Sequence, residues 1–191
     1  MIKLIFVRHG ESEKNTLDIK SCSLDKYPLT EKGKKEVEKL ANEITDKIDL
    51  IITSPVLRAR ETAEILNKKF KAKILIDPLI SEYDYGQWND RTKKDLLEND
   101  EDYRKYRQME PGEERYNFKL GSTGESRKEI EERVREFIEK VKKEYVDKNI
   151  LVVSHGGINA AIYKVLNNSS IEEYFESERI GYSDIQTFII K

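Results

Sequence analysis

The chain has 191 residues, which is enough for one domain of ordinary size with a well-packed core. Its 35 Lys and Arg residues nearly balance 37 Asp and Glu residues, so the net charge of -2 supplies no basic field for nucleic acid or a membrane surface. No apolar run is long enough to span a bilayer, and the single cysteine, Cys22, excludes an internal disulfide, so we expect a cytoplasmic protein.

The first apolar run, Ile2 to Val7, contains several β-branched residues and predicts a buried strand. We expect the helix after it to begin at Thr30, whose side chain can cap the first turn. Apolar residues then recur at helical spacing, which predicts one buried face; they are Val37, Leu40, Ala41 and Ile44.

A second strand is predicted at Leu50 to Thr53 and a third at Ile74 to Ile76, with a helix between them. We expect this helix to begin directly after the strand. Ser54 can serve as its N-cap, and Pro55 suits the first helical position, where a missing N–H has no consequence.

The periodicity weakens over residues 89–124, where charged residues mix with tyrosines. We expect this stretch to form a cap or lid excursion at the edge of the sheet within a single domain that spans residues 1–191. Three of its arginines suit either contacts with a second acidic group of a ligand or an ordinary solvated surface, and the surface is the commoner outcome. These residues are Arg104, Arg107 and Arg115.

The last third of the chain continues the alternation. A long helix is predicted from about Glu125 to Tyr145, a fourth strand at Ile150 to Val153 and a final strand from Asp184 to Ile190. Ser170 and Glu173 have the spacing of a capping box, which predicts another helix start. Tyr and Phe side chains near the C-terminus leave two alternatives open: they pack against a second subunit in a homodimer, or they complete the core.

This alternation of strands and helices is typical of an α/β fold with a mostly parallel sheet that is covered on both faces. In such sheets ligands bind at the carboxyl ends of the strands. Reactive residues follow the four predicted strands at Arg8-His9, Arg58, Glu82 and Ser154-His155. We therefore expect four distant segments to meet at one edge of the sheet.

The chain has only two histidines, His9 and His155, and each follows an apolar run and precedes a glycine. A lone histidine after a strand more often has a structural role, but two histidines in matching contexts favour a catalytic site. Two imidazoles, two guanidinium groups and one carboxylic acid suit a phosphate dianion and make a poor cation site. A neutral imidazole can attack phosphorus, while the acid protonates the leaving oxygen and then activates water.

Five segments resemble motifs of the histidine phosphatase superfamily, also called phosphoglycerate mutase-like. The most specific are Arg8-His9-Gly10-Glu11-Ser12 with Asn15, similar to R-H-G-E-S-x-x-N, and Ser54-Pro55-Val56-Leu57-Arg58-Ala59 with Thr62-Ala63, similar to S-P-x-x-R-A-x-x-T-A. The others are Glu82 to Gly86 with Trp88, Gly124-Glu125-Ser126 with Arg133, and Val153-Ser154-His155-Gly156-Gly157.

The resemblance implies a three-layer α/β/α sandwich, phosphatase activity, a small phosphorylated substrate and no metal or other cofactor. It implies that His9 is the nucleophile that accepts the phosphoryl group and that Glu82 is the proton donor. The phosphoryl oxygens would be held by Arg8, Arg58 and His155, with Asn15 assisting in the pocket.

Departures from the motifs favour the phosphatase branch. Lys14 stands where the cofactor-dependent mutases have Trp, and Asn89-Asp90 stands where many members have Glu-Gly. The chain is also too short for the larger insertion of those mutases. We therefore expect hydrolysis of a small phosphorylated metabolite, as in the broad-specificity or α-ribazole phosphatases.

Three alternatives stay open. A phosphoglycerate-type mutase would return the phosphate to its product and need a bisphosphorylated primer. A phosphatase for protein phosphohistidine or phosphotyrosine would need a shallow, open site, against which the predicted lid argues. A non-catalytic phosphate-binding module is disfavoured because every reactive residue is present. We expect no nucleic-acid or membrane partner.

Overall fold

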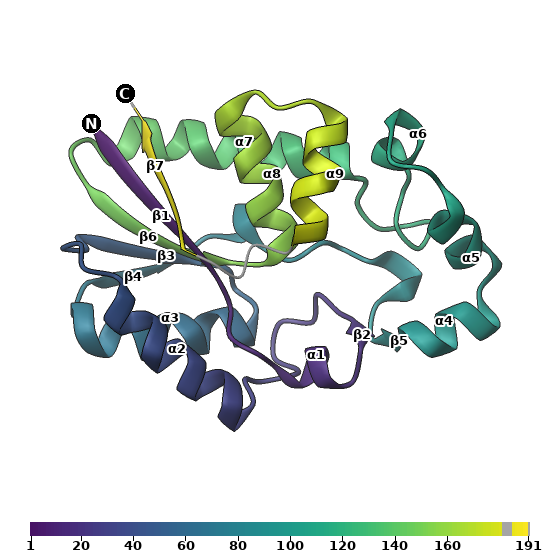
Figure 1. Cartoon of the computed structure of the whole chain (residues 1–191), viewed down its shortest axis with the longest axis horizontal. Coiled ribbons are helices and arrows are strands. Elements are labelled where there is room, and N and C mark those ends of the chain that lie inside the picture. The colour runs from purple at the N-terminus through teal and green to yellow at the C-terminus, as the bar shows by residue number, and fades with distance from the viewer. Residues whose placement is uncertain (181–184, 191) are drawn as a thin grey trace.

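The computed structural model describes residues 1–180 and 185–190 and is built around a five-stranded sheet (Figure 1). The strands lie in the order β4 (Lys73–Ile76), β3 (Leu50–Thr53), β6 (Asn149–Ser154), β1 (Ile2–Arg8) and β7 (Gln186–Ile190). The first four run parallel, and β7 pairs antiparallel with β1 at the edge. The predicted α/β class with a mostly parallel sheet is confirmed.

Helices cover both faces of the sheet and give three layers (Figure 1). On one face lie α2 (Glu31–Glu43) and α3 (Leu57–Phe70). On the other lie α7 (Arg127–Glu144) and α8 (Gly156–Asn167), with α9 (Ile171–Ile180) packed against α8. The α/β/α sandwich implied by the resemblance is therefore present.

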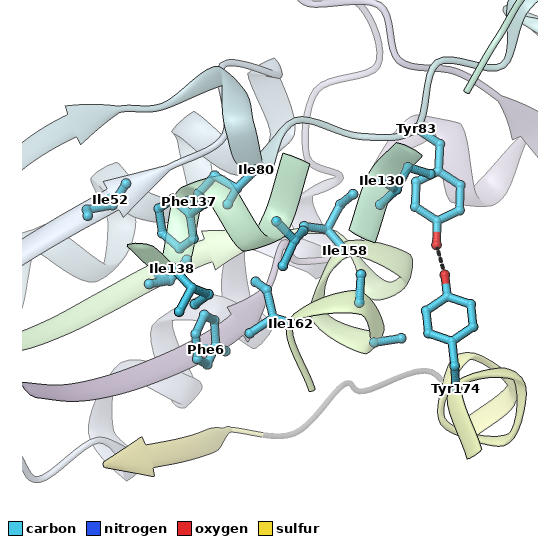
Figure 2. Packing of buried hydrophobic residues seen from close by; sticks show 14 of the residues in the cluster. Phe6, Ile52, Ile80, Tyr83, Ile130, Phe137, Ile138, Ile158, Ile162 and Tyr174 are labelled. Atoms are coloured by element: carbon cyan, nitrogen blue, oxygen red, sulfur yellow. Dashed lines mark hydrogen bonds between the residues drawn. The ribbon is translucent and has the colours of Figure 1, made fainter. Parts of the chain in front are cut away.

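Each face of the sheet has its own hydrophobic core. Along β1, Leu4 and Phe6 belong to the core beneath α7 and α8, whereas Ile5 and Val7 belong to the core against α2 and α3. Figure 2 shows Phe6 among the aliphatic side chains of the first core. Successive residues of a strand point to opposite faces, and a strand buried on both faces therefore reads as a continuous apolar run.

The predicted strands and two helix starts agree with the structure. The first four predicted strands occur within one residue of the expected bounds, and the last is described from Gln186 to Ile190. Thr30 caps α2 by accepting a hydrogen bond from the Gly33 backbone, and Ser126 caps α7 in a capping box with Glu129. These caps satisfy N–H groups that a helix start otherwise leaves unpaired, which fixes where each helix begins.

The predicted start of α3 is wrong. The helix begins at Leu57 with Val56 as its N-cap, so Ser54 does not cap it and Pro55 precedes it. The Ser54 hydroxyl is buried and hydrogen-bonded to His155 Nε2 at 2.8 Å, while it accepts only a 3.3 Å contact from the Val56 backbone. A contact across the sheet thus displaces the local capping preference.

Residues 89–124 lie to one side of the sheet and hold several short elements (Figure 1). These are β5 (Arg91–Thr92), which pairs with β2 (Ile19–Lys20), and the helices α4 (Lys93–Asn99), α5 (Glu101–Gln108) and α6 (Glu113–Asn117). Trp88 anchors them, because its ring centroid lies 5.0 Å from that of Tyr103 and 5.4 Å from that of Tyr106. These aromatic side chains belong to the hydrophobic core beneath α7 and α8, so their packing ties the segment to that face of the sheet.

The base of this segment is closed by backbone hydrogen bonds. Gln87 N donates to the Gly121 carbonyl at 3.0 Å, and Glu125 N donates to the Asp84 carbonyl at 2.9 Å. Gly86 has a φ of +52° in the 3-10 helix η2 (Gly86–Trp88), and a Cβ there would lie 2.5 Å from the Gly124 backbone nitrogen. Glycine is needed because both the backbone conformation and the close approach exclude a side chain.

The C-terminal part joins the core. Ser170 and Glu173 form the predicted capping box at the start of α9, and Tyr174 and Phe175 are buried within the chain. The hydroxyl of Tyr174 is hydrogen-bonded to that of Tyr83 (Figure 2). These observations favour the core alternative for the late aromatic residues. Asp184, the predicted first residue of the last strand, lies outside the described residues.

Among the described residues, no helix combines the length and apolar character needed to cross a bilayer.

Candidate functional site

Four distant segments bring reactive side chains to the carboxyl edge of the sheet. His9 follows β1, Arg58 lies in the first turn of α3, Glu82 follows the 3-10 helix η1 (Pro78–Ile80), and His155 follows β6. All four side chains are buried, and the two imidazole centroids lie 5.2 Å apart. The expected meeting of these residues at one edge is observed.

The imidazole of His9 has a fixed orientation. Its Nδ1–H donates to the Gly10 carbonyl at 2.7 Å, so Nε2 carries the lone pair and accepts from Arg58 Nε at 3.1 Å. Burial lowers the pKa of His9 well below its ordinary value, and the nearby His155, Arg58 and Arg8 lower the pKa further. His9 is thus held as a neutral imidazole with a lone pair facing the site.

Arg58 is the cation at the centre of the site and is fully buried. One terminal nitrogen donates to the Ser21 carbonyl and to Glu82 Oε2, each at 3.1 Å. The other terminal nitrogen is also buried, and the described residues offer it no hydrogen-bond partner. A buried N–H donor without a protein partner is what an oxyanion would satisfy.

His155 faces the same space from the end of β6, the strand that lies next to β1. Its Nε2 is hydrogen-bonded to Ser54 Oγ, which orients the ring, and its Nδ1 lies 3.5 Å from Arg58 and 3.6 Å from Glu82 Oε2. Burial lowers the pKa of His155 well below its ordinary value; the charge of Glu82 opposes this shift, and those of Arg58 and Lys14 add to it.

Glu82 is a buried carboxylate with cationic neighbours. Its Oε2 accepts from Lys14 Nζ at 2.7 Å and from Arg58 at 3.1 Å, and its Oε1 accepts from the Tyr83 backbone at 3.2 Å. Burial alone would raise the pKa of Glu82, but Lys14, His155 and Arg58 outweigh it and hold the pKa well below the ordinary value. Glu82 is therefore ionised when no ligand is bound.

The remaining two predicted residues, Arg8 and Asn15, border the site without contacting Glu82. Both line the cavity of about 370 Å³ that opens onto His9 and Glu82. Asn15 lies in α1 (Glu13–Thr16), where its Oδ1 accepts from both the backbone and the hydroxyl of Ser12. This fixes the side chain at the rim of the cavity.

The charge pattern of the site favours an anion. His9, Glu82 and His155 present ligand atoms within 4.8 Å of one another, a set that metal ions can use. However, the guanidinium of Arg58 donates to His9 and to Glu82, and the ammonium of Lys14 touches Glu82. A divalent cation there would be repelled by these two groups, whereas a phosphate dianion would be attracted.

Sequence reasoning missed the role of Lys14 in the site and treated it only as a departure from a motif. The Lys14 side chain is 11% exposed and forms a buried ion pair with Glu82. The sequence did contain a hint of this role, because Lys14 lies between His9 and Asn15, two residues that were assigned to the site.

A clamp behind Arg58 was also missed. Asp90 accepts hydrogen bonds from the Ser21 and Ser23 hydroxyls and from Lys26 Nζ, and Asn89 accepts one from the Cys22 backbone. These contacts hold the loop whose Ser21 carbonyl accepts from Arg58. Their partners lie more than 60 residues apart in the chain, so no local pattern reports them.

The three arginines considered for ligand contact, Arg104, Arg107 and Arg115, do not line the cavity at His9 and Glu82. Arg104 and Arg107 are exposed, and Arg104 donates to the carbonyls of Leu97 and Glu98. Arg115 lies over the rings of Tyr106 and Phe175. The surface alternative, with some packing by Arg115, describes them better than ligand contact.

Comparisons with known proteins agree with this geometry. The family model described as "Histidine phosphatase superfamily (branch 1)" matches residues 4–185. Phosphoserine phosphatase 1 of Hydrogenobacter thermophilus is 31% identical over 97% of this chain and 86% of its own length. A probable phosphoglycerate mutase of Photorhabdus laumondii is 33% identical over 82% of this chain and 70% of its own length.

Among solved structures, a putative α-ribazole-5'-P phosphatase from Escherichia coli superposes with a TM-score of 0.80 at 26% identity. The match covers 92% of this chain and 84% of that one.

Proposed function

Because the chain belongs to branch 1 of the histidine phosphatase superfamily, we propose that it hydrolyses small phosphomonoesters through a phosphohistidine intermediate at His9, without a metal ion. The observation that carries this proposal is the orientation of His9. Its Nδ1–H is fixed by the Gly10 carbonyl, so Nε2 points its lone pair at the Arg58 guanidinium, where a phosphoryl group would be held.

In the first step, Nε2 of His9 attacks phosphorus and the bond to the leaving oxygen breaks. The Arg58 nitrogen without a protein partner would donate to a phosphoryl oxygen, and Arg8 and His155 would contact the others, with Asn15 at the rim. These donors are already in place before the reaction, so they stabilise the developing charge without further reorganisation. The hydrogen bond from Arg58 to His9 must break when the phosphoryl group binds between them.

Glu82 would then protonate the leaving oxygen as the P–O bond breaks. In the second step the same carboxylate takes a proton from the water that hydrolyses the phosphohistidine, which restores His9 and releases phosphate. Lys14, His155 and Arg58 keep Glu82 ionised by lowering its pKa, but a bound dianion would draw the positive charge of Arg58 and repel the carboxylate. Both effects raise the pKa of Glu82 when substrate is bound.

The relatives suggest which substrates to test first. O-phosphoserine and α-ribazole phosphate are chosen because the names of two relatives contain them. We propose that residues 89–124 act as a cap beside the cavity, which favours small metabolites over phosphorylated proteins. The cavity of about 370 Å³ has room for a small phosphoester, in line with this choice.

Release of inorganic phosphate from a panel of small phosphoesters, with EDTA present, tests the proposal. We expect the native chain to be active with chelator and His9→Ala to lose at least about 10³-fold in kcat, because no nucleophile remains. Brief reaction and quenching in base should trap phosphate on the native protein as base-stable, acid-labile phosphohistidine. Full turnover by His9→Ala, or activity that EDTA removes, would contradict the proposal.

The mutase alternative is separated by the same assay. A relative with a mutase name is 33% identical over 82% of this chain, so this alternative has a specific observation behind it. A mutase would show slow net phosphate release and would interconvert phosphoglycerates only after priming by a bisphosphorylated compound. We expect rapid release without a primer.

A further inference from the structure

Lys14 is a buried cation held against the residue that must act as an acid. Its Nζ lies 2.7 Å from Glu82 Oε2, and the two side chains are 11% and 6% exposed. An ammonium group so close to a carboxylate stabilises the ionised form of that carboxylate. The ion pair with Lys14 therefore holds Glu82 in the state that cannot donate a proton.

Lys14 also faces the space that a substrate would occupy. It lines the cavity of about 370 Å³ together with Arg8, His9 and Glu82, and it lies over the ring of Tyr85 at 5.4 Å from the centroid. The other charged residues lining this cavity are Asp18, Lys20 and Lys93. Lys20 lies over the same Tyr85 ring at 5.2 Å, and Lys93 is paired with Asp18.

The buried ammonium of Lys14 is within reach of both Glu82 and an anion bound in the cavity. Burial lowers the pKa of Lys14, and so do Arg58 and Arg8, while Glu82 raises it. A lysine side chain is a flexible four-carbon stem with a compact charge, so it can turn from one anion to another within the same cavity. Glu82 would keep Arg58 and His155 as its remaining charged or titratable neighbours within 4 Å.

We propose that Lys14 is a specificity-determining residue that leaves Glu82 to bind a second anionic group of the substrate, either a carboxylate or a further phosphate. The inference rests on the proposed phosphatase function. A substrate with such a group would draw the Lys14 ammonium away, and the pKa of Glu82 would rise, so that Glu82 takes up a proton from the acid form of the buffer in the bulk solvent. The protonated Glu82 donates that proton to the leaving oxygen as the P–O bond breaks, and His9 holds the phosphoryl group.

A substrate without the second anion would leave Lys14 on Glu82. Such a substrate would still bind through its phosphate, but with Lys14 in place the pKa of Glu82 would rise less, so a smaller fraction of the bound enzyme would carry the proton donor near neutral pH. The second anion should therefore raise kcat as well as lower KM. Simple charge attraction would change KM alone.

O-phosphoserine and phosphoethanolamine make a matched pair of substrates, because they differ only by the carboxylate. With the native chain near pH 7.5 we expect kcat to be at least about 10-fold higher for phosphoserine. We also expect the alkaline limb of the kcat profile, which reports protonated Glu82, to lie at higher pH for phosphoserine. Comparing glycerol 1,3-bisphosphate with glycerol 3-phosphate, which differ only by one phosphate, tests a second phosphate in the same way.

The Lys14→Met variant removes the charge and keeps an unbranched side chain. We expect its kcat for phosphoethanolamine to rise at neutral pH, and the alkaline limbs for the two substrates to coincide. The matched comparison is Lys20→Met, which removes the other ammonium group that lies over the ring of Tyr85. It should raise KM for both substrates by similar factors and leave their alkaline limbs apart.

The inference is wrong if native kcat values and alkaline limbs are equal for the two substrates, a result that needs no variant. It is also wrong if Lys14→Met slows both substrates equally and keeps the limbs apart. Hydrolysis of p-nitrophenyl phosphate, whose leaving group needs no acid, separates the two proposals. If it proceeds while the other tests fail, only the role of Lys14 is lost; if no phosphoester is hydrolysed, the phosphatase function fails and this inference with it.

Discussion

The two imidazoles of the chain share one electrostatic environment, which lowers the pKa of both. Burial and the neighbouring guanidinium groups lower the pKa of His9 and of His155 well below the ordinary value. A nucleophile must be unprotonated, so this arrangement keeps His9 competent at pH values where an exposed histidine would be charged.

A histidine titration by NMR tests this directly, because the chain has only two sets of imidazole signals. We expect neither set to titrate near pH 6.5 in the folded protein, whereas both should do so in the unfolded chain. The charge of Glu82 raises the pKa of His155, so Glu82→Gln should move that titration to still lower pH. A normal titration of either imidazole near pH 6.5 in the folded native protein would contradict the assigned environment.

The same shifts predict how stability depends on pH. A histidine whose folded pKa is lowered takes up its proton only on unfolding, so the free energy of unfolding falls once the pH drops below about 6.5. Each such histidine contributes a slope of about 1.4 kcal/mol per pH unit in this window. Chemical denaturation between pH 7.5 and 5.5 should show this decline, and His155→Asn should reduce its slope by about half.

At the scale of elements, the clamp formed by Asn89 and Asp90 connects residues next to β5 with the loop after β2. It holds the Ser21 carbonyl, which in turn accepts from Arg58. Asp90 has a φ of +61°, in the left-handed region that aspartate tolerates better than most residues. The departure of Asn89-Asp90 from the family motif is therefore tied to a structural task.

Asp90→Gly tests this clamp, because glycine adopts the same backbone conformation and removes only the hydrogen bonds. We expect kcat/KM to fall about 10-fold as the Ser21 carbonyl and Arg58 lose their fixed positions. The matched control is Asp147→Gly, at a φ of +57° on the exposed surface far from the site in the fold, which should leave kcat/KM unchanged. Equal activity of the two variants would rule out a positioning role for Asp90.

Sequence patterns predicted the elements better than their junctions. The strands were predictable because β1, β3 and β6 are buried on both faces, so each is a continuous apolar run. The start of α3 was not, because Ser54 bonds to His155 across the sheet. Likewise, the meeting of His9, Arg58 and Glu82 followed from their positions after parallel strands. The Lys14 ion pair depends on side-chain packing, and only the position of Lys14 beside Asn15 pointed to it.

At the scale of the whole molecule, ligand binding should stabilise the fold by joining segments that are distant in the chain. Phosphate would contact residues after β1, in α3 and after β6, which belong to both faces of the sheet. A ligand at 100 times its Kd stabilises the folded state by about 2.7 kcal/mol. For a chain of this size that corresponds to a rise in Tm of roughly 5–10 °C.

Thermal unfolding with and without inorganic phosphate measures this effect. The rise in Tm should disappear in Arg58→Ala, which removes the central guanidinium. It should persist in Arg60→Ala, whose guanidinium is paired with Asp25 at the surface of the same helix. Loss of the stabilisation in both variants would indicate that phosphate does not depend on the central site.

The closed base of residues 89–124 makes this segment a separable unit of the protein. Its two ends are joined between Asp84 and Glu125 and between Gln87 and Gly121, while the histidines and Arg58 come from other stretches of the chain. Grafting the corresponding segment of a relative between these paired ends, with Asn89 and Asp90 kept, should retarget the enzyme toward other alcohols and leave phosphoryl chemistry intact. Evolution of new selectivity in this lineage can therefore proceed by exchange of one cassette.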